Sequence, residues 1–425
     1  MAIPAFIALV AEPLYVLVDT AIVGHLGTLP LGGLGVAGTL LTAAFGLFNF
    51  LAYATTATVA RRIGASDQRG AAEHGVAGLW LALGLGIAVT AVGLLLSGPA
   101  VTLMGASENV APYALTYLRI SLLGAPLLLV ALAGTGYLRG LQDTRTPLYI
   151  ALGANGFNLA LEILFVYALD LGIAGSAWGT VAAQLSAAVA YVVILNRNVR
   201  RAGAARRPER RQLRQAAVIG AQLTVRTGTL LVVFTTTSAI AARLGDVEIA
   251  AHQIGLQLWF FAALSLDAIA IAGQAIVGRS LGAQDAAGAR AASRRMIQWG
   301  VGIGAVLGAV IVVAEPLLAI AFTSDDAVQD LLFSVVLSVG LMQPLAGAVF
   351  VLDGILIGAG DARYLAIAMT FAMLCFFPFA IVVLVTEASL VALWGALWVF
   401  IIGRLYGLAR RYRRDDWLVT GALAS

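Results

Sequence analysis

The stretch NRNVRRAGAARRPERRQLR, residues 196–214, lies close to the middle of this 425-residue chain. It is strongly basic, whereas the whole chain is apolar: 61% of the residues are hydrophobic, 11% are charged and the mean hydropathy is +0.95. An average soluble domain has roughly 25% charged residues. The composition therefore predicts an integral membrane protein, and the basic stretch divides it into two halves.

Long apolar runs follow one another on both sides of this stretch. A helix that crosses a hydrocarbon core of about 30 Å needs roughly 20 apolar residues. Several runs exceed that length, so we expect tilted helices or extensions beyond the bilayer. The fold class is therefore all-α, with twelve predicted spans: 3–24, 29–58, 76–97, 112–138, 147–168, 172–195, 215–241, 247–276, 296–314, 328–357, 364–386 and 389–408.

The basic residues alternate with these spans. All 26 are arginines, and all except Arg119, Arg226 and Arg243 fall in one alternate set of breaks, including the tail from Arg404 to Arg414. The positive-inside rule places that set in the cytoplasm. We therefore expect a multi-pass protein of the cell's inner (plasma) membrane with both termini in the cytoplasm. A surface for nucleic acid explains the alternation less well.

The two halves repeat one another at a constant offset of 218 residues. Six spans is an even number, so the second half is expected to enter the membrane in the same direction as the first, with a ligand cleft between the two parallel repeats. We therefore predict an N-terminal lobe (1–195), a cytoplasmic linker (196–214) and a C-terminal lobe (215–425). The matching residues are Leu26/Gly27 with Leu244/Gly245, Arg61/Gly64/Ala65/Asp67/Gly70 with Arg279/Gly282/Ala283/Asp285/Gly288, Pro126 with Pro344, and Gly140/Asp143/Arg145 with Gly358/Asp361/Arg363.

The repeated loops RIGASDQRG and RSLGAQDAAG share one pattern, R-x-x-G-A-x-D-x-x-G. Their glycines permit positive φ, and the Arg and Asp can pair across the turn. We expect these loops to act as structural clamps, with a gating role as the alternative.

Seven ionisable residues qualify as intramembrane groups away from the span ends, where a charge costs at least about 2.5 kcal/mol and a functional role is the first hypothesis. Helical spacing puts Glu12, Tyr15 and Asp19 on one face, and Pro13 predicts a bend between them. The seven are Glu12, Asp19, Arg119, Glu162, Arg226, Asp267 and Asp353.

A second polar stripe lies in the fifth span, where Asn155, Asn158 and Glu162 follow one another at i, i+3 and i+7. A buried carboxyl that is balanced between desolvation and hydrogen bonding can take up H⁺ or Na⁺ on one side and release it on the other. The alternative is that these acids satisfy backbone or hydroxyl groups at helix kinks.

In the second half, Arg226, Asp267 and Asp353 can compensate one another inside the bundle. A structural network and a role in substrate binding or coupling both remain open for them.

Enzyme chemistry has no basis in this sequence. Cys375 is the only cysteine and the three histidines have no neighbours at ligand spacing, so no metal site is predicted. The absence of lysine excludes a P-loop, and no nucleophile elbow occurs. We predict no catalytic residue and no cofactor other than H⁺ or Na⁺ as coupling ion.

Six segments, in order, give the chain a resemblance to the multidrug and toxic compound extrusion (MATE) family and to its DinF-like branch. The resemblance covers nearly the whole chain, and the chain begins so close to the first span that the natural start is expected upstream of Met1. The segments are PLYVLVDTAIVGHLG, ARRIGASDQRG, YLRGLQDTRTP, NGFNLALEILFVYALDLGIAGSAWGT, VGRSLGAQDAAG and FVLDGILIGAGD.

The resemblance implies a two-lobed exporter driven by H⁺ or Na⁺. Asp19 matches the family's ion-coupling residue of the first helix, Asn158 and Glu162 match an N-x-x-x-D motif, and Thr180 matches a cavity threonine. Glu162 replaces the more common Asp. The seventh span has no acid that matches the Glu of the Na⁺-coupled branch and offers Gln222 and Arg226 instead, which weakens the case for a sodium site there.

The leading hypothesis is proton-coupled export by alternating access of small organic, cationic or amphipathic compounds. Asp19, Asn158 and Glu162 are assigned to ion coupling and Glu12 is a secondary candidate. An organic-anion (citrate-like) exporter is the first alternative, and a flippase for lipid-linked substrates is the second. Expected partners are a small molecule and the lipid bilayer, with no nucleic acid, and the protein is expected to be a monomer. The remaining cavity candidates are Tyr15, Asn155, Thr180, Arg226, Asp267 and Asp353.

Overall fold

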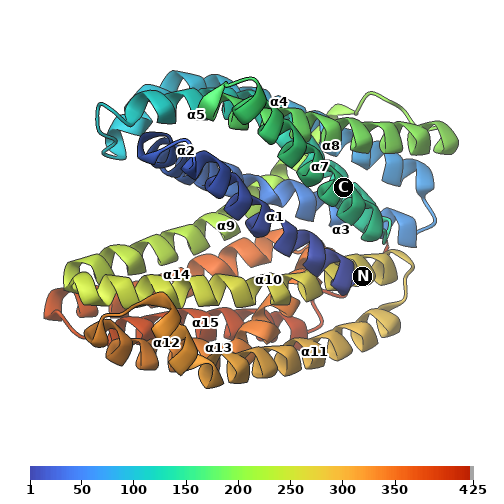
Figure 1. The fold of residues 1–425 in the computed structure, drawn as a ribbon. Helices are drawn as coiled ribbons and strands as arrows, with labels where there is room; N and C mark the ends of the chain where they lie inside the picture. The colour runs from blue at the N-terminus through green and yellow to red at the C-terminus, as the bar shows by residue number, and fades with distance from the viewer. Residues whose placement is uncertain (422–425) are drawn as a thin grey trace. The chain divides into compact units, whose positions relative to one another are not determined.

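The computed structural model describes residues 1–421, except for the side chain of Glu12, and this part of the chain is helical without β-strands (Figure 1). It divides into two compact units, unit 1 from Ile3 to Gly220 and unit 2 from Ala221 onwards. Each unit is described below by itself. The cleft expected between the two halves stays a prediction.

Unit 1 contains six candidate spans. Three of them are composite: α2, η1 and α3 run on from Thr28 to Gly64, α7 and η2 run on from Arg145 to Ala168, and α5 and α6 meet at a bend of 49°. Pro126 lies in the first turn of α6, where its missing N–H removes a bond that would continue α5. The elements are α1 (Ala2–Gly24), α2 (Thr28–Gly46), η1 (Leu47–Asn49), α3 (Phe50–Gly64), α4 (Gln68–Leu103), α5 (Ala111–Leu123), α6 (Ala125–Gly140), α7 (Arg145–Ile163), η2 (Leu164–Ala168) and α8 (Gly172–Ala202).

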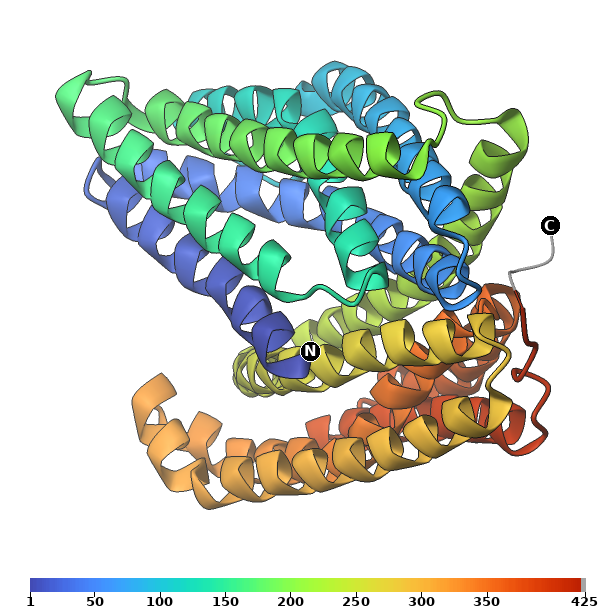
Figure 2. The same ribbon diagram turned by 90° about the vertical axis from the view of Figure 1, so that its right-hand side faces the viewer.

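Unit 2 also provides six candidate spans, so the predicted twelve are confirmed when the bent pair α5 and α6 counts as one. The linker is shorter than the predicted 196–214, because α8 continues to Ala202 and α9 begins at Arg210. Figure 2 shows the helices of this unit from a second side. The elements are α9 (Arg210–Leu244), α10 (Asp246–Gly282), α11 (Ala286–Val313), α12 (Glu315–Phe322), α13 (Asp326–Gly358), α14 (Ala362–Thr386) and α15 (Leu390–Arg413).

The repeat predicted at an offset of 218 residues extends to the helix contacts inside each unit. In both units the same glycines lack room for a Cβ because a neighbouring helix backbone lies against them. Two helices can approach this closely only where a small residue faces the partner. Both units therefore use one packing scheme. The matching contacts are Gly136 on Ala52 with Gly354 on Ala270, Gly140 on Thr56 with Gly358 on Gln274, and Gly86 on Pro126 with Gly304 on Pro344.

The repeated loops are helix caps rather than glycine turns. Asp67 accepts a hydrogen bond from the Gly70 amide at 2.7 Å at the start of α4, and Asp285 does the same for α11. The loop glycines Gly64 and Gly282 do not use the positive φ that glycine permits, and the left-handed residues are Ser66 and Gln284. Gly70 and Gly288, three residues after the capping acids, are needed for another reason, since a Cβ there would collide with the capping carboxylate.

The first of these loops also contains an ion pair. Asp67 Oδ2 lies 2.8 Å from Nη1 of Arg62, so Arg62 takes the place that the motif assigned to Arg61. Burial alone would raise the pKa of Asp67, but the hydrogen bond from Gly70 and the neighbouring Arg62 lower it overall. Asp67 thus stabilises the fold while it is charged.

Replacing either cap should lower the free energy of unfolding by about 1 kcal/mol, the usual contribution of an N-cap carboxylate. Asp67→Ala should cost more than Asp285→Ala at neutral pH, because Asp67 also forms an ion pair with Arg62. Since the folded pKa of Asp67 is lowered, its contribution is complete above the unfolded pKa and is lost as the pH falls. Thermal unfolding midpoints in detergent at neutral and acidic pH measure both effects, and equal shifts would contradict the ranking.

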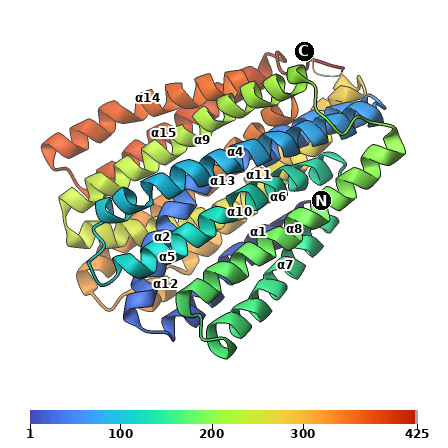
Figure 3. The same cartoon turned by 90° about the horizontal axis from the view of Figure 1, so that it is seen from above.

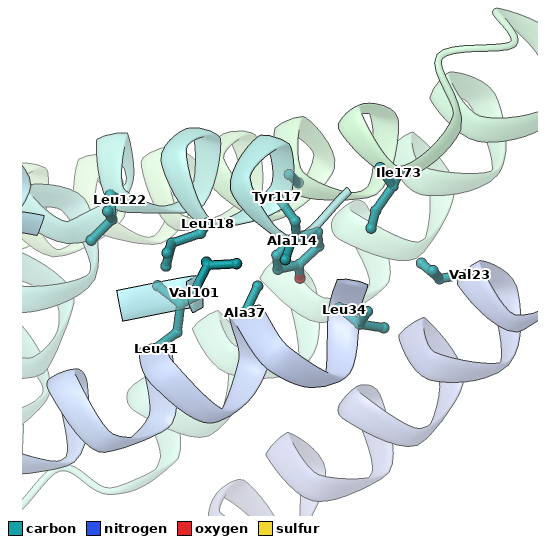
Figure 4. Close-up of a cluster of buried hydrophobic side chains, with 11 residues drawn as sticks. Val23, Leu34, Ala37, Leu41, Val101, Ala114, Tyr117, Leu118, Leu122 and Ile173 are labelled. Carbon is teal, nitrogen blue, oxygen red and sulfur yellow. The ribbon is translucent and has the colours of Figure 1, made fainter. Parts of the chain in front are cut away.

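A cluster of apolar side chains joins five helices of unit 1 at the end of α1 (Figure 4). Val23 of α1 and Ile173 of α8 belong to it, together with residues of α2, α4 and α5. Tyr117 of α5 is part of the same cluster and is 6% exposed, yet its hydroxyl reaches Asp19. The cluster therefore fixes the helices that carry the polar site described next.

Candidate functional site

Unit 1 contains a partly open cavity of about 710 Å³ that is lined by α1, α2, α5, α6, α7 and α8. These helices can be followed from above in Figure 3. The structure brings to its wall five of the residues that the sequence assigned to the site: Tyr15, Asp19, Asn155, Asn158 and Thr180. Two sequence stripes 140 residues apart thus form one polar surface.

Asp19 is held by two hydroxyl groups. Ser176 of α8 donates a hydrogen bond to Oδ1 at 2.6 Å, and Tyr117 of α5 donates to Oδ2 at 3.4 Å. The carboxyl group is 5% exposed. Neither hydroxyl was predicted, although Ser176 lies one helical turn before Thr180 and so shares its face.

Glu162 lies beside this group. It is fully buried, and its carboxyl group lies beside the carboxyl group of Asp19 and the hydroxyl group of Ser176. Among the described residues, neither of its oxygens meets the geometric criteria for a hydrogen bond. The structure therefore places two carboxyl groups together in a buried position with few donors around them.

Asn158 connects the second stripe to α1. Its Nδ2 donates to the Tyr15 hydroxyl and, at 3.4 Å, to Oγ1 of Thr180. Gly179 makes this approach possible, because a Cβ there would lie 2.9 Å from Oδ1 of Asn158. The side chains of three helices thus meet through one amide.

Helix α1 has little apolar contact with its surroundings. Of its described side chains, only those of Ala5, Asp19 and Val23 are buried. The remaining fixed contacts are polar and include the bond from Tyr167 to the backbone of Ile22. Elements with few buried apolar contacts have low local stability, so α1 is the part of unit 1 that a change in the polar site can move most easily.

The other predicted residues of α1 need separate mention. The side chain of Glu12 lies outside the described residues. Pro13 lies inside a helix that is continuous from Ala2 to Gly24, and the bend predicted there stays a prediction.

Unit 2 contains a different polar group. Nη2 of Arg226 and Nη2 of Arg404 each lie 2.7 Å from Oδ2 of Asp353. The pairing of Arg226 with Asp353 was predicted. The second cation on Asp353 is Arg404, which was not predicted. Asp267, the third predicted member, is half-buried on α10. Assigning Arg404 to a cytoplasmic tail was wrong, since its side chain is only 2% exposed. Two guanidinium groups thus share one carboxylate inside unit 2.

The offset of 218 residues relates this ion cluster to the cavity of unit 1. Arg226 and Asp353 occupy the positions of Ala8 and Thr135, which line the cavity. Asp19 in turn corresponds to Thr237. The two units therefore share a backbone plan but differ in chemistry, with a cavity and two acids in unit 1 and ion pairs in unit 2.

Across the described residues, no group of three or more His, Cys, Asp or Glu side chains could hold a metal ion together. The polar site of unit 1 consists of two carboxyls with amide and hydroxyl groups, a set that suits a proton or a monovalent cation.

Two six-span units and a polar cavity inside one of them define a multi-pass membrane transporter. Residues 4–164 and 225–382 match the MatE family, and the chain belongs to that family.

The chain is similar to known proteins over almost its whole length. It is 33% identical to Protein DETOXIFICATION 44, chloroplastic, of Arabidopsis thaliana, over 98% of this chain and 82% of the relative. It is 30% identical to DNA damage-inducible protein F of Escherichia coli K12, over 97% and 91%. A crystal structure of MATE in the straight conformation has the same fold, with a TM-score of 0.87 at 22% identity over 98% and 95% of the two chains.

Proposed function

We propose that this transporter exports small organic, cationic or amphipathic compounds and that inward flow of protons through the acids of unit 1 drives the export. One observation carries the proposal: Asp19 and Glu162 lie side by side, buried, where Asp19 lines a cavity of about 710 Å³. A cavity of this size suits a drug-sized molecule.

Two adjacent buried carboxyl groups cannot both stay charged without compensation, so the pair holds either a proton or a cation. Ser176 and Tyr117 donate hydrogen bonds to the two carboxylate oxygens of Asp19. A proton that enters this group therefore changes its charge and its hydrogen bonds together. The pair is suited to bind and release one ion per cycle.

The change reaches α1 through polar contacts. Tyr15 and Asp19 lie on this helix, and both are bonded to side chains of α7 or α8. Because few apolar side chains of α1 are buried, breaking these bonds frees the helix at low cost. Movement of α1 into or out of the cavity would then exclude the substrate in one state and admit it in the other, as alternating access requires.

The driving force is adequate for one proton per cycle. One pH unit supplies about 1.4 kcal/mol per proton, and 100 mV supplies about 2.3 kcal/mol per charge. A tenfold concentration ratio of a neutral substrate needs about 1.4 kcal/mol, so either component alone suffices for it. Exchange of one monovalent cation for one proton moves no net charge, so the pH difference alone drives export of such a substrate.

Proteoliposomes with separately imposed gradients test the coupling ion. We expect an inward proton gradient to drive ethidium transport, and a sodium gradient of equal size to leave the rate at the level without a gradient, because H⁺ is the ion proposed to bind the carboxyl pair. Initial rates of dye movement are the measurement. Transport driven only by sodium would contradict proton coupling while leaving the carboxyl site in place.

Export of organic anions is the second candidate. The observation that favours it is that two guanidinium groups, those of Arg226 and Arg404, share the single carboxylate of Asp353. Comparing citrate with ethidium in the same proteoliposomes separates the two substrate classes. Transport of citrate without ethidium would replace cationic export by this alternative.

The arginine distribution supports a cytoplasmic position for both termini. Cys375 is the only cysteine, so a Cys375→Ser chain provides a clean background for single cysteines near Met1 or Arg414. Labelling of whole cells by an impermeant maleimide should fail at both positions and succeed after permeabilisation.

A further inference from the structure

A dense group of exposed arginines lies where α8 ends and α9 begins. Residues 197–214 contain eight arginines and a single acid, Glu209, and all eight arginine side chains are exposed. We call this group the arginine surface. It belongs entirely to unit 1.

The arginine surface has a defined shape. Gly203, with φ of 61°, ends α8 in the left-handed conformation and turns the chain back. The carbonyl oxygen of Arg206 then accepts a hydrogen bond from Nε1 of Trp80 at 3.3 Å, and Gln212 donates to Glu73 at 3.4 Å. These contacts hold the turn along the first part of α4.

The contact with Trp80 indicates the depth of the surface in the membrane. Trp80 is half-exposed and lies close to the start of the apolar run 76–97. Tryptophan side chains favour the boundary between headgroups and hydrocarbon. A loop that is bonded to such a residue lies at the level of the phosphate groups.

The fold itself does not use these charges. Within residues 1–421, none of the eight arginines forms a salt bridge. Those at the end of α8 suit the helix dipole, but α9 begins with Arg210 and Arg211 and has no acid in its first turn. Cations at a helix start are unfavourable unless an anion lies nearby. The acids beside this helix start are Glu209, directly before α9, and Glu73, which is bonded to Gln212, so the eight arginines outnumber the local negative charges.

We propose that the arginine surface binds the headgroups of anionic phospholipids in the leaflet that it faces. Clusters of four to eight basic residues beside a membrane helix attract such lipids. Guanidinium groups also hold phosphate oxygens through two parallel hydrogen bonds. Trp80 sets the height of the loop, and the arginines gather the phosphates.

Mass spectrometry of the solubilised full-length protein with added lipid tests the proposal. The wild type should retain phosphatidylglycerol at least tenfold better than phosphatidylcholine of the same chain length. The quadruple variant Arg206→Gln, Arg207→Gln, Arg210→Gln, Arg211→Gln should lose most of this preference, because each arginine near an anionic surface strengthens binding about fivefold. Added salt should weaken the wild-type preference.

A matched control removes four exposed arginines elsewhere, Arg294, Arg295, Arg363 and Arg413, also by change to glutamine. It should keep the lipid preference, and unfolding midpoints equal to the wild type would show that both variants fold. Loss of the preference in the control, or its retention in the quadruple variant, would overturn the proposal. Displacement of the lipid by inorganic phosphate alone would do so too, since it would identify a free-anion site.

Discussion

Asp19→Asn should reduce proton-driven dye efflux at least tenfold. Asparagine has the same shape, and its amide oxygen can accept from one of the two hydroxyl groups of Ser176 and Tyr117 while its NH2 group donates to the other, so the fold around the site is expected to remain. An amide cannot take up or release a proton near neutral pH, however. The pair that Asp19 forms with Glu162 then loses one of its two titratable members. The initial rate in proteoliposomes under an imposed pH gradient is the measurement.

The chain offers a matched control for this substitution. Asp170 is an exposed acid with φ of 52° in the turn before α8, and asparagine tolerates that conformation well. Asp170→Asn makes the same chemical change outside the cavity and should transport at the wild-type rate. Full retention of proton-driven efflux by Asp19→Asn would remove this residue from the coupling mechanism.

Glu162→Gln separates the two acids. If the pair shares one proton, either amide variant should abolish coupling while substrate binding survives. A variant that keeps coupled transport would identify its acid as structural. Binding of ethidium, measured by fluorescence without a gradient, shows whether the cavity is intact in both variants.

The polar site of unit 1 was largely predictable because helical periodicity places residues. Asp19 and Tyr15 share one face of the first span, and Asn158 and Glu162 share one face of the fifth. The resemblance to the family assigned Thr180 to the same cavity. Spacing within each helix therefore identified the residues, although only the fold shows that the two stripes meet.

Three residues of the polar groups escaped prediction for physical reasons. Ser176 and Tyr117 are common in apolar helices, and nothing in the sequence tells a hydroxyl that meets an acid from one that bonds its own backbone. Arg404 was counted with the basic tail because α15 extends to Arg413 beyond its apolar run. Hydropathy cannot tell an arginine buried in a bundle from one in water.

Asp353→Asn should be the most destabilising single change in unit 2. It leaves Arg226 and Arg404 together in a buried position without the carboxylate that both contact at 2.7 Å. Breaking a buried ion pair by removing one partner costs about 3–5 kcal/mol, because the remaining charge is uncompensated. Here two charges remain. Thermal unfolding of the purified protein should show a large fall in the midpoint, whereas Asp330→Asn on the exposed surface of the same helix should show none.

The charges of Arg226, Arg404 and Asp353 predict an order in which substitutions of these residues destabilise the protein. A count of lost contacts alone does not predict this order. Arg226→Gln leaves one carboxylate with one guanidinium, a neutral pair, and should destabilise the protein less than Asp353→Asn. Arg404→Gln should cost more than Arg226→Gln, since Arg404 is the more deeply buried side chain and also lies over the rings of Phe350 and Phe400. Adding Arg404→Gln to Asp353→Asn should recover part of the lost stability, because it removes one uncompensated charge. Purely additive losses in this double-mutant cycle would show that the three side chains do not act as one electrostatic group.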